Sequence, residues 1–260
     1  MEIDINDIRK MVSDFRKEHS ELGKIINPII EKYNLPRKEI LEVCQIGKFA
    51  YKVNSEIKII EKPKPPDPDF IIELNSKLIG LEHTRVFTEN ADNYNRVISI
   101  IHLAEEIFSS QFPNDIVSTI ISIKDDRINY KQIEKRKLAT ELANYIYNSY
   151  KGVEIEIPSF VAALKVTKHS KLSFSYKEKK WQGPYLTKER LEIEIKKKEK
   201  KIEKYKKGNN KITEFWLVLL VGSLNSASYQ LDENLNYKTE SIFDQVYLMA
   251  DFDAEIIRIN

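Results

Sequence analysis

Residues 68–84 read Pro-Asp-Phe-Ile-Ile-Glu-Leu-Asn-Ser-Lys-Leu-Ile-Gly-Leu-Glu-His-Thr, and this stretch decides the fold. Phe70–Leu74 is an apolar run of strand length, and Asn75–Lys77 has the polar residues of a tight turn. Leu78–Phe87 then has the composition of a strand that returns beside the first. Four prolines in residues 63–68 forbid a helix just before this stretch. The sequence therefore predicts a β-hairpin that is entered by an extended chain.

Two carboxylates are expected at one end of this hairpin. Asp69 comes directly before the first strand, and Glu82 lies on the returning strand. Because side chains alternate between the two faces of a strand, Glu82 and Thr84 share one face while His83 points to the other. Mg²⁺ prefers oxygen ligands, and the backbone carbonyl of His83 can add one to the two carboxylates. Asp69, Glu82 and His83 are therefore the predicted ligands of a Mg²⁺ or Mn²⁺ ion.

Helices are predicted before the hairpin, and helices alternate with strands after it. Residues 1–55 have the pattern of helices, the last of which we expect to end at Gly47. An apolar stripe at helical spacing predicts a further helix at 94–110. Residues 215–221 are fully apolar, which is typical of a buried central strand. We expect an α/β fold with a helical extension at 1–55 and one α/β domain at 56–260.

The net charge of +2 hides an uneven distribution. Residues 171–211 contain 15 Lys and Arg against 6 Asp and Glu, while the rest of the chain is acidic. A basic helix is predicted over residues 188–207 within this segment. A basic face attracts phosphate, but a run of lysines is also typical of a helix that only keeps itself in water. The charge indicates nucleic acid as a partner and leaves a solvated surface as the alternative.

Composition excludes several classes of protein. Hydrophobic residues make up 42% of the 260 residues, which excludes a disordered chain and allows one large domain or two small ones. Cys44 is the one cysteine, so a disulfide scaffold, a zinc finger and an iron–sulfur cluster are excluded. No apolar run reaches the ~20 residues of a membrane helix, and the first residues lack a signal-peptide pattern. We expect a soluble cytoplasmic protein that does not bind membranes.

The order of these motifs resembles the PD-(D/E)xK nuclease superfamily. That superfamily has Pro-Asp at one strand and Glu-x-Lys on the next, where this chain has Pro68-Asp69 and Glu82-His83-Thr84. Farther along, Lys201-Ile-Glu-Lys-Tyr205 is similar to the Gln-x-x-x-Tyr motif of the RecB-type exonuclease branch, with Lys201 in place of Gln. The motifs also resemble a group of uncharacterised bacterial nuclease-like proteins, and they cover about residues 63–248. The resemblance implies a restriction-endonuclease-like mixed sheet flanked by helices.

Thr84 departs from the superfamily pattern, which has at this position a lysine that orients or activates the attacking water. Threonine has no charge, so it cannot stabilise a developing negative charge as an ammonium group does. One interpretation is that Lys200 or Lys201 of the basic helix reaches the same space. The other is that the site has lost hydrolysis and keeps only a binding role.

Together, the resemblance and the basic helix predict a Mg²⁺-dependent phosphodiesterase that hydrolyses DNA. The predicted catalytic residues are Asp69, Glu82, Thr84, Lys200 and Lys201. The residues predicted to bind nucleic acid are Lys197, Lys204, Tyr205 and Lys207. For Tyr205, packing of the helix onto the sheet is the alternative to stacking on a base.

Other functions stay open at this point. A catalytically inactive nuclease fold that binds nucleic acid or another protein would keep the same motifs. An α/β enzyme acting on a small phosphorylated substrate is a weaker option, because no GxGxxG or GxxxxGK loop is present. The choices between DNA and RNA, and between endonuclease and exonuclease, are not decided by these residues. A homodimer is compatible with the sequence.

Overall fold

The computed structural model describes residues 4–179, 183–208, 211–222, 225–251 and 255–260. The chain divides into two compact units. Unit 1 contains Met1–Val86, Tyr185–Gly222 and Leu231–Asn260, and unit 2 contains Phe87–Pro184 and Ser223–Gln230. This division differs from the predicted boundary between residues 55 and 56. The reason is that the N-terminal helices share a core with the hairpin, whereas residues 97–174 supply a separate core.

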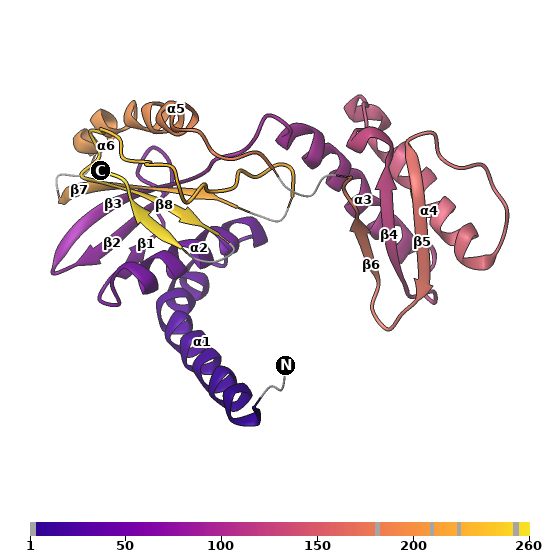
Figure 1. Ribbon diagram of the computed structural model, residues 1–260, viewed down its shortest axis with the longest axis horizontal. Helices are drawn as coiled ribbons and strands as arrows, with labels where there is room; N and C mark the ends of the chain where they lie inside the picture. The colour runs from indigo at the N-terminus through magenta and orange to yellow at the C-terminus, as the bar shows by residue number, and fades with distance from the viewer. Residues whose placement is uncertain (1–3, 180–182, 209–210, 223–224, 252–254) are drawn as a thin grey trace. The chain divides into compact units, whose positions relative to one another are not determined.

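Unit 1 is built on a mixed sheet of six described strands in the order β1-β2-β3-β7-β8-β9 (Figure 1). The strands are β1 (Lys58–Glu61), β2 (Phe70–Leu74), β3 (Lys77–Arg85), β7 (Ile212–Val221), β8 (Gln245–Ala250) and β9 (Ile256–Arg258). β3, β7 and β8 run parallel, and the outer strands pair antiparallel. β7 is buried over residues 215–221, so the prediction of a central buried strand is confirmed.

Helices cover both faces of this sheet (Figure 1). They are α1 (Ile5–Tyr33), α2 (Arg37–Val53), α5 (Lys188–Glu199) and α6 (Ile202–Gly208). On one face, Phe49 of α2 packs in a core with Leu81 and Trp216. On the other face, the ring of Tyr205 from α6 stacks on Phe215, with 6.0 Å between the ring centroids. The expected α/β architecture, a mixed sheet flanked by helices with an N-terminal helix, is confirmed.

Gly47 lies inside α2, so the prediction that a helix ends there is wrong. α1 crosses α2 at this residue, and a Cβ atom on Gly47 would lie 2.4 Å from Cγ1 of Ile26. A glycine in a helix can therefore mark a close helix crossing as well as a helix end.

Unit 2 has its own sheet and its own core. Its three described strands lie in the order β5 (Val161–Lys168), β4 (Val117–Ile123) and β6 (Ser173–Tyr176). Helices α3 (Ala91–Gln111) and α4 (Lys135–Lys151) pack against them. Two short 3₁₀ helices span Lys124–Asp126 and Gln132–Glu134. The helix predicted at residues 94–110 is thus present as α3, as part of unit 2. In the described parts of both units, no helix is long and apolar enough to cross a membrane.

Candidate active site

The β2–β3 hairpin brings Asp69 and Glu82 opposite each other. Turn residues 75–76 have φ angles of 51° and 61°, the left-handed conformation that suits a two-residue hairpin turn. The antiparallel register pairs Phe70 with Leu81. Continuing this register by one residue sets Asp69 against Glu82. The two carboxyl groups lie near each other at this end of the hairpin, because the charge of Glu82 acts on Asp69 and the backbone N–H of His83 bonds to Asp69.

Contacts around the hairpin hold Asp69 in place. Its Oδ2 accepts a hydrogen bond of 3.0 Å from the backbone N–H of His83. Pro68 lies close over β3, because Gly80 has no side chain there. A Cβ atom on Gly80 would lie 2.9 Å from Cγ of Pro68 and 3.0 Å from the ring of Phe215. The Pro-Asp dipeptide and Gly80 therefore fit together as one packing arrangement.

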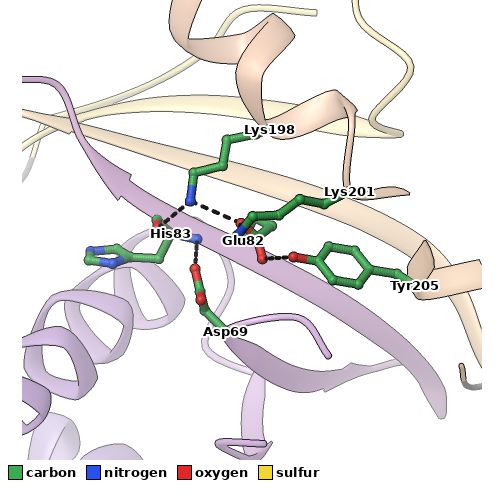
Figure 2. Close-up of polar contacts among 6 residues, drawn as sticks. All are labelled: Asp69, Glu82, His83, Lys198, Lys201 and Tyr205. Atoms are coloured by element: carbon green, nitrogen blue, oxygen red, sulfur yellow. Dashed lines mark hydrogen bonds and ion pairs between the residues drawn. The ribbon is translucent and has the colours of Figure 1, made fainter. Parts of the chain in front are cut away.

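Glu82 is the centre of the site, and it is only 1% exposed. Its Oε2 accepts hydrogen bonds from Nζ of Lys198 and Nζ of Lys201, each at 3.0 Å (Figure 2). Its Oε1 accepts a hydrogen bond of 2.5 Å from the hydroxyl of Tyr205. A buried carboxylate is costly unless it is paired and hydrogen-bonded, and these contacts meet that requirement.

The partners of Glu82 come from the junction between α5 and α6. α5 ends at Glu199 and α6 begins at Ile202, so the predicted continuous helix over residues 188–207 is broken there. Lys198, Lys201 and Tyr205 follow one another at spacings of three and four residues, which places them on one face of helical backbone. This face also carries Ile202, which is fully buried. The three polar side chains therefore point at the sheet.

The two carboxyl groups have opposite pKa shifts. Burial by itself raises the pKa of Glu82, but the Lys198 ammonium, the Tyr205 hydroxyl and the Lys201 ammonium together lower it below its ordinary value. Burial and the negative charge of Glu82 raise the pKa of Asp69. Glu82 is thus held as a charged acceptor. Asp69 is a carboxylate that a further cation nearby would stabilise.

His83 contributes its backbone and keeps its ring on the other face of β3. The ring meets Phe70 edge-on, with 6.5 Å between the centroids. Burial lowers the pKa of His83 to about 4, so the ring is neutral near pH 7. Within the described residues, its Nε2 is buried without a hydrogen-bond partner. The carbonyl oxygen of His83 lies 3.5 Å from Nζ of Lys198. The carbonyl, and not the ring, is therefore the part of His83 that belongs to the site.

Asp69, Glu82 and the carbonyl of His83 offer oxygen atoms, which are the kind of ligand that a small hard cation prefers. Nζ of Lys198 contacts both Oε2 of Glu82 and the carbonyl oxygen of His83, so a cationic group already lies between two predicted ligands. The described residues contain no group of three or more His, Cys, Asp and Glu side chains placed to hold a metal. Mg²⁺ needs only one or two carboxylates, because it keeps several waters. The donor set therefore suits Mg²⁺ or Mn²⁺ if the Lys198 ammonium moves aside.

The remaining residues predicted to be catalytic differ in whether they contact Glu82. Lys201 reaches Glu82, as one interpretation required. Lys200 is exposed at the end of α5, and the contacts of Glu82 within the described chain do not include it. Thr84 lies on β3 two residues beyond Glu82 and is half-buried. Lys198 was not predicted, although its spacing of seven residues from Tyr205 places both on one helix face.

The residues predicted to bind nucleic acid divide into two groups. Lys204 and Lys207 are exposed on α6. Lys197 is also exposed, and its Nζ lies 2.8 Å from a carboxylate oxygen of Glu194. Tyr205 is only 3% exposed, so it cannot stack on a base. The prediction that Tyr205 binds nucleic acid is therefore corrected to the packing alternative, with its hydroxyl bound to Glu82.

Comparison with family models, with curated proteins and with solved structures gave no significant match to this chain.

Proposed function

We propose that this chain is a metal-dependent phosphodiesterase that hydrolyses DNA and has a restriction-endonuclease-like fold. The observation that carries the proposal is the buried carboxylate of Glu82, which lies beside Asp69 and binds two lysine ammonium groups. The motif order of the hairpin and of the Lys201–Tyr205 helix supports the same class of enzyme.

Charge balance explains how such a site would handle phosphate. The carboxylates of Asp69 and Glu82 carry two negative charges, which the ammonium groups of Lys198 and Lys201 offset. A divalent cation bound to the carboxylates would leave the site positive. A phosphodiester is an anion, and its negative charge grows as the attacking oxygen adds. A positive site beside a basic helix surface would therefore stabilise the transition state more than the bound substrate.

Each side chain has a defined part in this proposal. Bound Mg²⁺ would supply a water of lowered pKa and would offset charge on the phosphate. Asp69, Glu82 and the carbonyl of His83 would provide oxygen ligands. The side chain of Lys201 is 45% exposed, so its ammonium can approach a phosphate that arrives from solvent. Tyr205 holds one oxygen of Glu82 and thereby fixes the direction of the other.

The second candidate is a nuclease-like fold that binds nucleic acid without cleaving it. One observation favours it, since Nζ of Lys198 lies between Glu82 and the carbonyl of His83. If that ammonium stays in place, it takes the position of the metal and leaves the site neutral. The two candidates therefore differ in whether a divalent cation displaces Lys198.

Calorimetric titration with Mg²⁺ and Mn²⁺ tests the proposal, together with cleavage assays on linear and circular DNA. We expect divalent binding and metal-dependent cleavage in the natural sequence, and the loss of both in Asp69→Asn and in Glu82→Gln. Glu73→Gln is the matched control, because Glu73 lies on β2 of the same hairpin but is half-buried away from these lysine contacts. Undiminished metal binding in both site variants would overturn the proposal. Metal binding without cleavage of DNA or RNA would favour the non-catalytic candidate.

A further inference from the structure

α1 carries a repeating apolar pattern along its whole length. Its residues alternate at spacings of three and four, which is the heptad pattern of helices that pair side by side. The residues at these positions are Ile5, Ile8, Val12, Phe15, His19, Leu22, Ile26, Ile29 and Tyr33. With one histidine in the middle, the pattern continues for four heptads without a change of register.

The C-terminal half of this stripe is used inside unit 1. Ile29 is only 2% exposed in the core that includes α2, and Ile26 packs against Gly47 of α2. The described contacts between α1 and α2 reach as far as an ion pair of 3.3 Å between Glu18 and Lys52. Lys52 is next to the last residue of α2. α1 therefore continues for more than three turns beyond the helix that covers it (Figure 1).

The N-terminal half of the stripe is open to solvent. Ile5 is 62% exposed, Val12 is 40% exposed and Phe15 is 68% exposed. Met11, beside the stripe, is 66% exposed. Large apolar side chains that are exposed together on one helix face mark a surface that binds another molecule. The apolar pattern that packs the C-terminal half of α1 into unit 1 therefore continues along the N-terminal half, where it is exposed.

We propose that the exposed stripe from Ile5 to Phe15 binds the same stripe of a second copy of this chain as a parallel two-stranded coiled coil. The stripe can pair with an identical stripe, because in a coiled coil the apolar side chains of one helix pack into the gaps between the apolar side chains of the other. The stripe occupies the first and fourth positions of each heptad, which are called a and d. His19 follows at an a position, where a polar residue favours a single register and a dimer.

Charges beside the stripe select the parallel direction. Arg9 and Arg16 flank it on one side, at the heptad positions called e. Glu18 flanks it on the other side, at a position called g, and Asp4, which directly precedes α1, extends the same side. In a parallel pair, the g position of one helix faces the e position five residues later in its partner, so Asp4 faces Arg9 of the second copy. In an antiparallel pair, e positions face e positions, so arginine would face arginine, which is repulsive.

A membrane surface fits this segment less well than a second helix does. Helices that lie on membranes carry an excess of Lys and Arg on their polar face. The side of α1 opposite the stripe mixes both signs, with Asp7, Lys10, Asp14 and Lys17. Mixed charge of this kind is typical of the solvent side of a coiled coil.

Sedimentation equilibrium of the full chain tests the dimer. We expect a reversible dimer, with a dissociation constant that rises by about tenfold or more in Val12→Glu and in Phe15→Glu, because each places two charges in the apolar seam. Ile133→Glu is the matched control, since Ile133 is 88% exposed in unit 2, and we expect it to leave the constant unchanged. Far-ultraviolet circular dichroism checks that each variant keeps its helices. A monomer at every concentration, or a dimer that both stripe variants leave intact, would overturn the proposal.

Cysteine crosslinking tests the direction of the pair. In a Cys44→Ala background, Val12→Cys should form a disulfide between two copies when oxidised glutathione is added, because equivalent a positions face each other only in a parallel pair. Lys17→Cys, on the outer side of the helix, should not. Exchange of charges should also matter: Arg9→Asp should weaken the dimer, and adding Asp4→Arg should restore it. Crosslinking of the outer cysteine alone, or binding of the chain to phospholipid vesicles through this stripe in place of dimerisation, would overturn the proposal.

Discussion

Glu82 shows how one buried charge organises the residues around it. A carboxylate that is 1% exposed is strongly destabilising if it is left alone, so the fold must supply donors for it. Lys198, Lys201 and Tyr205 are these donors, and each of them belongs to the short stretch where α5 meets α6. Both ammonium groups contact buried Glu82, but the Lys201 side chain is 45% exposed and the Lys198 side chain only 18%. Of the groups that stabilise Glu82, the Lys201 ammonium is therefore the one that a phosphate from solvent could reach most directly.

The Lys201→Ala variant tests whether Lys201 acts in catalysis or only stabilises the buried charge of Glu82. We expect this change to lower metal-dependent DNA cleavage by about 10²-fold, because the ammonium would stabilise charge that develops only in the transition state. Calorimetric metal affinity should stay near that of the natural sequence. Lys206→Ala is the matched control, since Lys206 is an exposed lysine of α6 that belongs neither to the site nor to the four lysines assigned to DNA binding.

Thr84→Lys in the Lys201→Ala background should restore part of the lost rate. A lysine at residue 84 would share the face of Glu82 and could place an ammonium group beside it. Unchanged cleavage in both Lys201→Ala and Lys198→Ala would contradict the hypothesis that a lysine from the α5–α6 junction takes the role of the superfamily lysine that Thr84 replaces. The metal alone would then activate the water.

At the scale of elements, α5 and α6 and the residues that join them carry four exposed lysines that the proposed function assigns to DNA binding. Lys197, Lys200, Lys204 and Lys207 are all exposed there. Replacing the four by Gln should weaken binding to duplex DNA and flatten the dependence of log K on log salt, because each phosphate contact contributes a slope of about −0.9. Fluorescence anisotropy at several salt concentrations measures the slope. Replacing Lys10, Lys17, Lys24 and Lys32 of α1 is the matched control, and an equal loss in both variants would argue against a specific basic surface.

The crossing of α1 and α2 makes a second prediction at this scale. Gly47→Ala should lower the free energy of unfolding by about 1–3 kcal/mol, because the new Cβ would meet Ile26 in a packed core. Gly23→Ala is the control. Its new Cβ would meet only the Asn27 side chain at 3.5 Å, and alanine favours the helix by up to about 1 kcal/mol. Urea unfolding should therefore give opposite signs for the two variants, and equal signs would contradict the close crossing.

At the scale of the whole molecule, the two units have separate cores. Leu142 is fully buried in the core of unit 2, and Ile46 is fully buried in the core of unit 1. Leu142→Ala should lower the unfolding free energy of unit 2 by about 2–5 kcal/mol and leave divalent binding at Asp69 and Glu82 unchanged. Ile46→Ala should lower the unfolding free energy of unit 1, which holds these carboxylates. Differential scanning calorimetry with and without Mg²⁺ measures both effects, and loss of metal binding in Leu142→Ala would contradict the separation.

The sequence alone determined the parts of this protein that depend on neighbouring residues. The hairpin follows from a polar turn between two apolar runs, and strand alternation then assigns Glu82 and His83 to opposite faces. The fully apolar run at residues 215–221 identified the central strand, because only a strand covered on both faces has no polar side. These features have a period or a spacing that a reader of the sequence can count.

Only the tertiary structure decided which distant side chains meet. Whether Lys198, Lys200 or Lys201 reaches Glu82 depends on where α5 breaks and how α6 lies on the sheet, which are set by the burial of Ile202 and Tyr205. The place of Gly47 inside α2 depends on the path of α1 across it. The division into two units depends on which apolar faces share a core, and helix α3 has the same sequence pattern in either arrangement. Burial and contacts between segments far apart in the chain produce no local pattern in the sequence. Only the folded structure therefore shows which of these segments meet.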